Sequence, residues 1–444
     1  MKILFAHQNF PGQFKHLCRH FVEEGGHELY FLTRDNQNRI PGVERLVYEP
    51  QREVTRGIHH YIAEYEKAIL YGQACVRHVV ALKERGWKPD IMIGHNGWGE
   101  TLFLKDVFPD VPMLSYFEFF YNSWDADCSF DPEYPMSFDD RLRVRVKNST
   151  NLTGLVAADW GLSPTNWQRS RYPLEFQQKI SVIHEGVNTD ELVPDPTVTV
   201  TLADGRVLTR NDEVITYVSR NLEPYRGFHT VMRALPEILR RRPNAIVLMI
   251  GGDDVSYGRR LPEGETYKKK YLAEVNIDPS RVLFLGKIPY EQFVGVLRLS
   301  AVHVYLTYPF VLSWSMLEAM SLGCMVVGSR TPPVMEALEH EKTGLLVDFF
   351  STTELADAVD RVLDHPTRMQ HLRDAARQHI INTYDLKRIC LPQTLTLIRE
   401  LAARKRPTVG LWKPPVQMAA PAAAKPVILP ASRSRVPANL RRGR

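Results

Sequence analysis

The sequence has few cysteines and no long apolar run, and these two shortages exclude several classes of protein. Its five cysteines are odd in number, widely spaced and never form C-x-x-C: Cys18, Cys75, Cys128, Cys324 and Cys390. A disulfide framework or a zinc site is therefore not expected, and plain packing roles in a reducing cytosol fit better. No run approaches the roughly 20 apolar residues that cross a bilayer. The opening MKILFAH is too short for a secretory leader and is typical of a first β-strand.

Acidic residues are absent from the end of the chain. Residues 402–444 hold ten of the 56 basic residues and no Asp or Glu, which leaves 46 basic and 51 acidic residues, a net charge of −5, before them. The overall charge of +5 therefore comes from the tail and does not indicate a fold that binds nucleic acid. Beyond Arg406 seven prolines and seven alanines leave no periodicity, so disorder is expected there.

What is present is typical of a globular protein of two or three domains, with 444 residues, 44% of them hydrophobic and 24% charged. Short apolar runs alternate with helical patterns, which predicts parallel sheets covered on both faces. Strands are expected at Lys2–His7, Glu28–Thr33, Ile91–His95, Met113–Phe119, Leu155–Ala158, Ile180–His184, Val214–Ser219, Ala245–Ile250, Val282–Leu285, Val302–Thr307, Met325–Gly328 and Gly344–Val347. Helices are expected at Gly57–Arg85, Phe228–Arg240, Tyr290–Leu299, Trp314–Leu322, Thr353–Asp364, Thr367–Tyr384 and Asp385–Arg404.

This pattern restarts near residue 190, so the expected fold class is α/β with two doubly wound, Rossmann-like halves. The expected domains are residues 1–190 and 191–385, followed by a helix at 386–405 that packs back on the body and a basic, Pro/Ala-rich tail at 406–444. The segment Thr197–Arg210 is expected to form an added hairpin that turns at Asp204-Gly205.

The first candidate site is the loop HQNFPGQF, which follows the first strand. Its Pro11-Gly12 pair opens a helix at the carboxyl end of a parallel strand, where ligands bind in open α/β sheets. The glycine lets backbone N–H groups approach a phosphate. The loop lacks G-x-G-x-x-G, so it is no dinucleotide fingerprint, and a plain turn between strand and helix remains the alternative.

The second candidate site is VSRNLEPYRGF, in which a strand delivers Arg220 and a helix begins just after Arg226. Two guanidinium groups beside a helix N-terminus make an anion clamp, because each can bind phosphate oxygens through two parallel hydrogen bonds. The alternative is that both are solvated loop arginines.

The third candidate site lies in YPFVLSWSMLEAMSLGCMVVGS. Its loop, with Ser313, Trp314 and Ser315, offers free amides at a helix N-terminus, which suit a phosphate. Glu318 is expected one turn inside that helix, within reach of a sugar hydroxyl, or exposed without a role.

In combination these motifs resemble the donor domain of the family 4 retaining glycosyltransferases, which have the GT-B fold. The resemblance depends on L-E-A-M-S-x-G-C-x-V-V, S-R-N-x-E-P-Y-R-G-F, VIHEGVNTDEL and TGLLVD, and the opening HQNFPGQFKHL resembles the N-terminal domain of one subgroup. It covers roughly residues 1–400. It implies that residues 1–190 are an acceptor domain and residues 191–385 a donor domain, which face each other across a cleft.

The resemblance also implies roles for single residues. Arg220 matches the arginine that contacts the donor pyrophosphate, and Arg226 takes the place of the usual lysine. Glu318 matches the second glutamate of E-x7-E, which holds the nucleotide ribose. Gly12 matches the glycine loop that faces the diphosphate, and Lys287-Ile288 fall where backbone groups read the base.

Two positions depart from the family pattern. Phe310 stands eight residues before Glu318, where the first glutamate of E-x7-E is expected, and Glu118 stands in place of the active-site histidine. Both positions touch the donor sugar in the family, so Glu118 is expected to assume the lost hydroxyl contact. His95, which also ends a strand, is either a second polar contact to sugar or acceptor or a buried structural residue.

Other polar and aromatic segments carry weaker signals. Asp125 and Asp127 have D-x-D spacing, but the GT-B pattern usually works without a metal, so no metal is expected. Gly251–Asp254 is expected to be a loop at the edge of the cleft. The aromatic residues of Tyr116–Tyr121 line an acceptor groove or pack in the core.

The sequence therefore predicts an enzyme that transfers a sugar from a nucleotide-diphospho-sugar to a hydroxyl of a saccharide, glycoconjugate or lipid-linked acceptor. Arg220, Arg226 and Glu118 are the expected catalytic residues, and retention without a metal or cofactor is implied by the resemblance. The alternatives are a nucleotide-sugar epimerase and a non-catalytic sugar-nucleotide sensor. A cytoplasmic location is expected, with the basic tail either at the inner face of the membrane or a passive solubilising segment.

Overall fold

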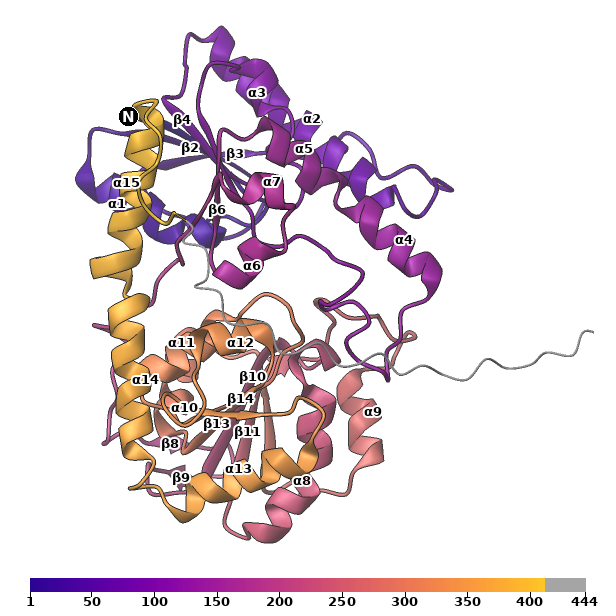
Figure 1. The fold of residues 1–444 in the computed structure, drawn as a ribbon, viewed down its shortest axis with the longest axis vertical. Helices are drawn as coiled ribbons and strands as arrows, with labels where there is room; N and C mark the ends of the chain where they lie inside the picture. Colours follow the sequence, from indigo (N-terminus) through magenta and orange to yellow (C-terminus); the bar gives the residue numbers. More distant parts are fainter. Residues whose placement is uncertain (412–444) are drawn as a thin grey trace, which may run out of the picture. The chain divides into compact units, whose positions relative to one another are not determined.

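Each half of the chain folds around its own parallel sheet. The computed structural model describes residues 1–411 (Figure 1). The N-terminal domain contains a seven-stranded sheet in the order β3-β2-β1-β4-β5-β6-β7, and the C-terminal domain a six-stranded sheet in the order β12-β11-β10-β13-β14-β15. The strands of the first sheet are β1 (Lys2–Ala6), β2 (Glu28–Thr33), β3 (Val43–Val47), β4 (Ile91–His95), β5 (Met113–Tyr116), β6 (Trp160–Ser163) and β7 (Ile180–Val182). Those of the second are β10 (Val214–Asn221), β11 (Ile246–Gly252), β12 (Val282–Gly286), β13 (Val302–Tyr305), β14 (Val326–Ser329) and β15 (Leu345–Val347).

Helices cover both faces of the first sheet, because its central strands are apolar on both sides. In β1 the side chains of Ile3 and Phe5 pack into one core and those of Leu4 and Ala6 into another. The first core also contains residues of α1 (Lys15–Glu24) and α15 (Leu391–Ala402), and the second contains residues of α2 (Ala63–Glu84), α3 (Leu104–Val107) and α5 (Ser149–Ala157). The remaining helices of this domain are α4 (Phe138–Lys147), α6 (Asn166–Ser170) and α7 (Leu174–Gln177).

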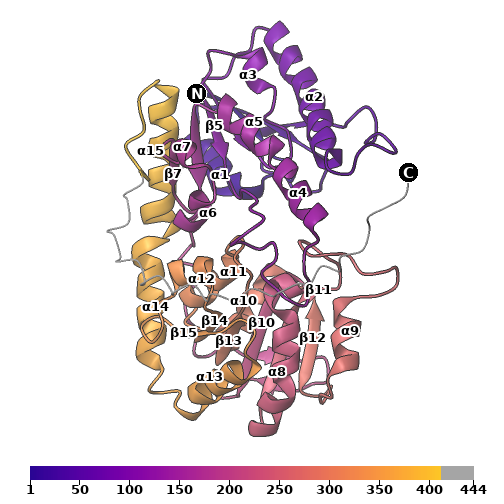
Figure 2. The same ribbon diagram turned by 45° about the vertical axis from the view of Figure 1, so that its right-hand side comes forward.

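The second sheet is sandwiched in the same way (Figure 2). One core contains residues of α8 (Phe228–Arg241), α9 (Tyr267–Glu274) and α13 (Thr352–Asp364). The other contains residues of α10 (Tyr290–Leu299), α11 (Trp314–Ser321), α12 (Pro332–Ala337) and α14 (Gln370–Thr383). The expected hairpin is confirmed as the antiparallel pair β8 (Val200–Thr201) and β9 (Val207–Leu208).

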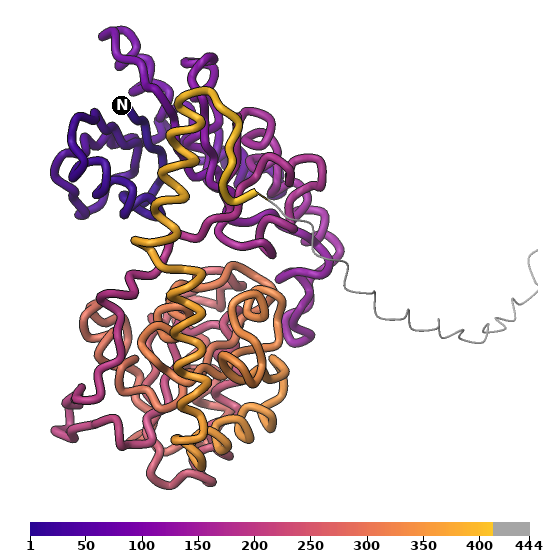
Figure 3. The backbone as a smooth tube through the Cα atoms, turned by 60° about the vertical axis from the view of Figure 1, so that its left-hand side comes forward, coloured from indigo at the N-terminus to yellow at the C-terminus, as the bar shows by residue number. Residues whose placement is uncertain are grey.

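The chain crosses between the domains twice, after β7 and after α14 (Figure 3). The two crossings are joined by a bridge between Val187 and Asp385, and the π-helical turn Leu386–Cys390 then leads into α15, which packs on α1, β4 and β5. The C-terminal helix therefore belongs to the core of the N-terminal domain.

A second attachment between the domains comes from residues 125–134, here called the strap. Asp127 accepts a hydrogen bond from the Tyr225 hydroxyl at 2.9 Å, and Asp131 accepts one from the Tyr308 hydroxyl at 2.5 Å. Farther along, Glu133 pairs with Arg233 at 2.7 Å. The strap therefore fixes the N-terminal domain to the turn just before α8, to α8 itself and to the loop that follows β13 of the C-terminal domain.

Several sequence predictions are confirmed and a few are wrong. The other expected strands are present with small shifts at their ends, and all five cysteines are free and buried. The strand expected at Leu155–Ala158 lies in α5 instead, because a four-residue apolar run fits either structure, and β6 follows it. The expected helix at Gly57–Arg85 begins only at Ala63, and β3 was not expected, because its half-buried edge position leaves only a weak apolar pattern.

The prediction that disorder begins at Arg406 is wrong for the next residues. The carbonyl of Gly410 accepts a hydrogen bond from the Val182 amide at 2.8 Å, and Val409 accepts one from the Ser181 hydroxyl at 2.8 Å. These residues therefore run along the free edge of β7. The rest of the expected tail lies outside the described residues. Among residues 1–411 no helix is long and apolar enough to cross a bilayer.

Candidate functional site

The expected site residues lie at the carboxyl ends of strands where the strand order of each sheet reverses. In the N-terminal sheet this switch lies between β1 and β4, which end next to the Gly12 loop and His95. In the C-terminal sheet it lies between β10 and β13, which end next to Arg220 and the loop that contains Phe310. Ligands of open α/β sheets bind at such switch points.

The Gly12 loop is shaped around a buried histidine. Gly12 has φ +52°, and a Cβ atom there would lie 2.6 Å from the imidazole of His7. Nδ1 of His7 accepts a hydrogen bond from the Asn9 amide at 2.9 Å, so the neutral ring carries its proton on Nε2. Burial, followed by the charge of His95, lowers the pKa of His7 well below its usual value. His7 is therefore a neutral donor directed at the loop.

Gln13 connects this histidine to Glu118. Its Oε1 lies 2.6 Å from His7 Nε2, and its Nε2 donates to Glu118 Oε1 at 3.0 Å. On the other side of the carboxylate, Nε2 of His95 lies 3.5 Å from Glu118 Oε2, while Nδ1 of His95 accepts from the Gly97 amide at 3.0 Å. The imidazole of His95 and the amide of Gln13, which is itself held by His7, thus fix the orientation of the Glu118 carboxylate.

Glu118 is held in its ionised form. Burial acts to raise its pKa, but the interactions with His95, the charge of Arg220 and the hydrogen bond from Gln13 outweigh burial and lower the pKa below its usual value. Arg220 belongs to the other domain, and it is near enough for its charge to act on this carboxylate. Arg220 is exposed, and its side chain makes no hydrogen bond within residues 1–411.

Arg226 is in a different situation, because its guanidinium is buried. Nη1 donates to the Tyr305 hydroxyl at 3.1 Å, to Thr307 Oγ1 at 2.8 Å and to the Val311 carbonyl at 2.9 Å. The guanidinium also lies over the ring of Phe310, with 5.9 Å between Cζ and the ring centroid. Arg226 therefore positions the loop between β13 and α11 in this structure.

Phe310 is the centre of an aromatic cluster that spans both domains. Its ring is 4.8 Å from Phe119, 4.9 Å from Tyr257 and 5.4 Å from Tyr225, measured between centroids. Only 6% of the residue is exposed. The ring occupies the position of the expected glutamate, and no hydrogen bond to a sugar can come from it.

The N-terminus of α11 is organised by Ser313. Its amide donates to the Tyr305 hydroxyl at 2.8 Å, and its hydroxyl caps the Ser315 amide at 3.4 Å. Trp314 is 47% exposed and donates from Nε1 to Glu185 of the other domain at 3.2 Å. Two amides expected to receive a phosphate therefore have partners within the protein here.

Glu318 lies in the first two turns of α11, as the sequence predicts. It accepts a hydrogen bond from the Tyr290 hydroxyl at 2.8 Å, and burial raises its pKa despite this bond and the charge of Lys15. Lys15, which follows the Gly12 loop, is thus near enough for its charge to act on Glu318. Ile288 lies in the loop between β12 and α10, next to Lys287. The side chain of Lys287 lies so close to Gly252 that a Cβ atom there would be 2.6 Å from its Cε.

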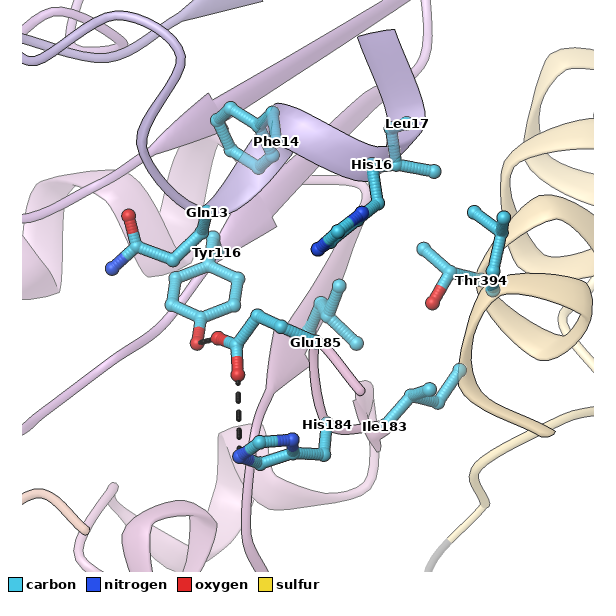
Figure 4. A pocket seen from close by; sticks show the side chains of 11 residues that line it. Gln13, Phe14, His16, Leu17, Tyr116, Ile183, His184, Glu185 and Thr394 are labelled. Atoms are coloured by element: carbon cyan, nitrogen blue, oxygen red, sulfur yellow. Dashed lines mark hydrogen bonds and ion pairs between the residues drawn. The ribbon is translucent and has the colours of Figure 1, made fainter. Parts of the chain in front are cut away.

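A small pocket lies behind the Gly12 loop (Figure 4). Its volume of about 30 Å³ holds about one water molecule. The side chain of Glu185 projects into the pocket between Tyr116 and His184. It accepts a hydrogen bond from the Tyr116 hydroxyl, and its Oε2 lies 3.4 Å from Nε2 of His184. The pocket is too small for a sugar. Glu185 lines it together with Gln13 of the Gly12 loop and also accepts the hydrogen bond from Trp314.

In the D-x-D motif, Asp127 is hydrogen-bonded to a tyrosine of the other domain. Burial raises the pKa of Asp127, although its carboxylate accepts a hydrogen bond from the Tyr225 hydroxyl. The backbone of Asp125 has a positive φ of 52°. Within residues 1–411 no three His, Cys, Asp or Glu side chains are grouped as a metal site.

Sequence reasoning missed four residues that the structure adds to this site: His7, Gln13, Lys15 and Glu185. Three of them are within five residues of Gly12, so proximity to the glycine loop was a usable signal. Glu185 gave none, because its role depends on Trp314, which is distant in the sequence.

Comparison with known proteins assigns both halves of the chain. A family model described as glycosyl transferase family 4 group matches residues 25–192, and one described as glycosyl transferases group 1 matches residues 203–379. In the solved structures, Anabaena HepE in complex with UDP and glucose has the same fold, with a TM-score of 0.60, 16% identity, and coverage of 89% of this chain and 99% of that one.

Two curated relatives resemble shorter parts of the chain. The D-inositol 3-phosphate glycosyltransferase of Corynebacterium jeikeium is 34% identical over 35% of this chain and 37% of its own length. The GDP-mannose-dependent alpha-(1-6)-phosphatidylinositol monomannoside mannosyltransferase of Mycolicibacterium smegmatis is 26% identical over 50% of this chain and 57% of its own length. The matched segments thus span about two fifths and somewhat more than half of these relatives. With family models across both domains and the GT-B arrangement of two parallel sheets, the chain belongs to the family 4, group 1 glycosyltransferases.

Proposed function

We propose that this glycosyltransferase moves a sugar from a nucleotide-diphospho-sugar to an acceptor hydroxyl, with retention and without a metal. The observation that carries the proposal is the position of Arg220 at the carboxyl end of β10. Its side chain is exposed and makes no hydrogen bond inside residues 1–411, and its charge acts on Glu118 of the other domain. A cation for a diphosphate and a carboxylate for sugar hydroxyls then face each other across the reacting bond.

In this reaction the C–O bond between the anomeric carbon and the diphosphate breaks, and its electron pair remains on the diphosphate. The acceptor oxygen forms the new bond to that carbon and loses its proton. With retention, the departing phosphate is on the same side of the sugar and can take this proton. Arg220 stabilises the charge that develops on the diphosphate, and such preorganised electrostatics is often the largest catalytic contribution.

Glu118 is proposed to accept a hydrogen bond from a donor-sugar hydroxyl. Its carboxylate is kept ionised and oriented by Gln13 and His95, so an acceptor lone pair can face the sugar without further rearrangement. Phe310 offers the sugar an apolar edge instead of the missing glutamate. Glu318 would hold the ribose, and Lys15 would bring a further positive charge to the nucleotide.

The test combines donor binding with product analysis. UDP-, GDP- and ADP-sugars are screened by thermal shift, and a ligand at 100 times its Kd adds about 2.7 kcal/mol to the free energy of unfolding. The donor that binds is then incubated with and without saccharide or lipid-linked acceptors. Transfer only with an acceptor supports the proposal. A changed sugar without an acceptor indicates an epimerase, and binding without any turnover indicates a sensor.

A further inference from the structure

The outer face of α4 and α5 presents a row of apolar side chains to solvent. Phe138 is 73% exposed, Leu142 41%, Leu152 42% and Val156 75%. Phe138 and Leu142 are four residues apart in α4, and Leu152 and Val156 are four residues apart in α5, so each pair lies on one face of its helix. The two helices follow each other directly, with only Asn148 between them (Figures 1 and 2). These four side chains are called the apolar row.

The apolar row is not the core face of these helices. Their inward face is supplied by other residues, such as Val144 and Leu155, which are 3% and 0% exposed. A helix on the surface normally has a polar outer face. Trp124, which is 63% exposed, adds a large ring beside the row, because the Arg141 guanidinium is 3.9 Å from its centroid. A second apolar face of this kind marks an interaction site.

The charge beside the apolar row is positive. Of the four basic residues of α4, Arg143 and Lys147 pair with Glu64 at 3.2 Å and 3.4 Å. Arg141 and Arg145 have no carboxylate partner within residues 1–411. Both lie on the same face as the first half of the row. The two acidic residues of α4 are already engaged: Asp139 with His60 and Tyr61, and Asp140 with Ser137 and Arg143.

We propose that the apolar row, with Arg141, Arg145 and Trp124, docks this protein on an anionic lipid surface. The apolar side chains would enter the boundary of headgroups and acyl chains, the arginines would meet phosphate groups, and the tryptophan suits the interface between water and lipid. A second copy of the chain fits less well. Arg145 is close to the middle of the row, so pairing two rows in either direction places the two Arg145 side chains near each other, and like charges repel.

The experiment measures the partition of the full-length protein onto sedimented vesicles. The vesicles are made of phosphatidylcholine alone or of phosphatidylcholine and phosphatidylglycerol at about 7:3, because the surface charge attracts basic residues near it. The double variant Phe138→Ser/Leu142→Ser is compared with the control Val207→Ser, a 57% exposed valine of the hairpin in the other domain. Arg145→Gln is compared with Arg368→Gln, an exposed arginine between α13 and α14.

The double variant is expected to bind phosphatidylglycerol vesicles at least tenfold less than the wild-type protein, and Arg145→Gln severalfold less, while both controls bind as wild type. The basic tail is present in every variant, so its contribution cancels in these ratios. All four variants should keep the wild-type melting temperature and donor thermal shift, which separates this proposal from the proposed function. Unchanged vesicle binding by the double variant overturns the proposal. A dimer that the double variant dissociates, with vesicle binding unchanged, also overturns it and assigns the row to a second copy.

Discussion

Restoring the family glutamate at position 310 should harm this protein. In Phe310→Glu the new carboxylate would replace a ring that is 6% exposed and lies against three other aromatic rings. Removing a buried phenylalanine side chain costs about 3–5 kcal/mol, as Phe310→Ala would show. Burying a carboxyl group adds a further penalty. The nearby Arg226 offsets only part of it, because its Nη1 already makes three hydrogen bonds.

The assay is thermal unfolding of three variants, Phe310→Leu, Phe310→Ala and Phe310→Glu, beside donor turnover. For a domain of this size about 1 kcal/mol shifts the melting temperature by about 2–4 °C, so Phe310→Ala should melt about 6–20 °C below wild type. Phe310→Leu should lose less, because it keeps most of the volume. Phe310→Glu should melt no higher than Phe310→Ala and turn over more slowly than wild type. A wild-type melting temperature or a gain in turnover for Phe310→Glu would refute the reasoning.

Four further outcomes are expected. Arg220→Ala should lower turnover by about 10²-fold, as the loss of one preorganised donor does, and wild-type turnover would contradict its role at the diphosphate. Glu318→Gln should weaken donor binding by about 1.5–3 kcal/mol, the strength of a charged hydrogen bond, and normal binding with early melting would make the residue structural. The proposed role of Glu118 uses its ionised carboxylate, and the lowered pKa keeps this form as the pH falls through the ordinary glutamate range. His95→Ala removes one cause of that lowering and should move the acid limb of turnover to higher pH, which a pH–rate profile checks. Removal of residues 407–444 should lower the melting temperature more than removal of the residues beyond 411, since only the longer deletion uncovers β7; equal melting temperatures would speak against the edge contacts.

The alternation of apolar runs and helical patterns was sufficient to predict two doubly wound sheets, since strands such as Ile91–His95 are buried on both faces and read as continuous apolar runs. It was insufficient where a segment is short or half-buried. Leu155–Ala158 has no period that separates strand from helix, and the edge strand β3 is buried too little to be apolar throughout.

The site residues that could be predicted are those in local motifs, and the contacts that could not be predicted join distant segments. Arg220 and Glu318 are recognisable because each sits in a local motif at a strand or helix end. The engagement of Arg226 with Thr307 and the contact of Trp314 with Glu185 join segments that are far apart in the sequence. Such pairings depend on tertiary packing, which no local spacing encodes.

The strap changes how the two domains can separate. The strap adds contacts between the domains to those of the two covalent crossings, of the Phe119–Phe310 ring pair and of the Trp314–Glu185 hydrogen bond. Opening then requires the contacts of Asp127, Asp131 and Glu133 to break together. Each factor of ten in the open population corresponds to about 1.4 kcal/mol, so a few such contacts keep the open form a small minority. Raised ionic strength, which weakens exposed ion pairs, would weaken the Glu133–Arg233 contact and so increase the population of the open form.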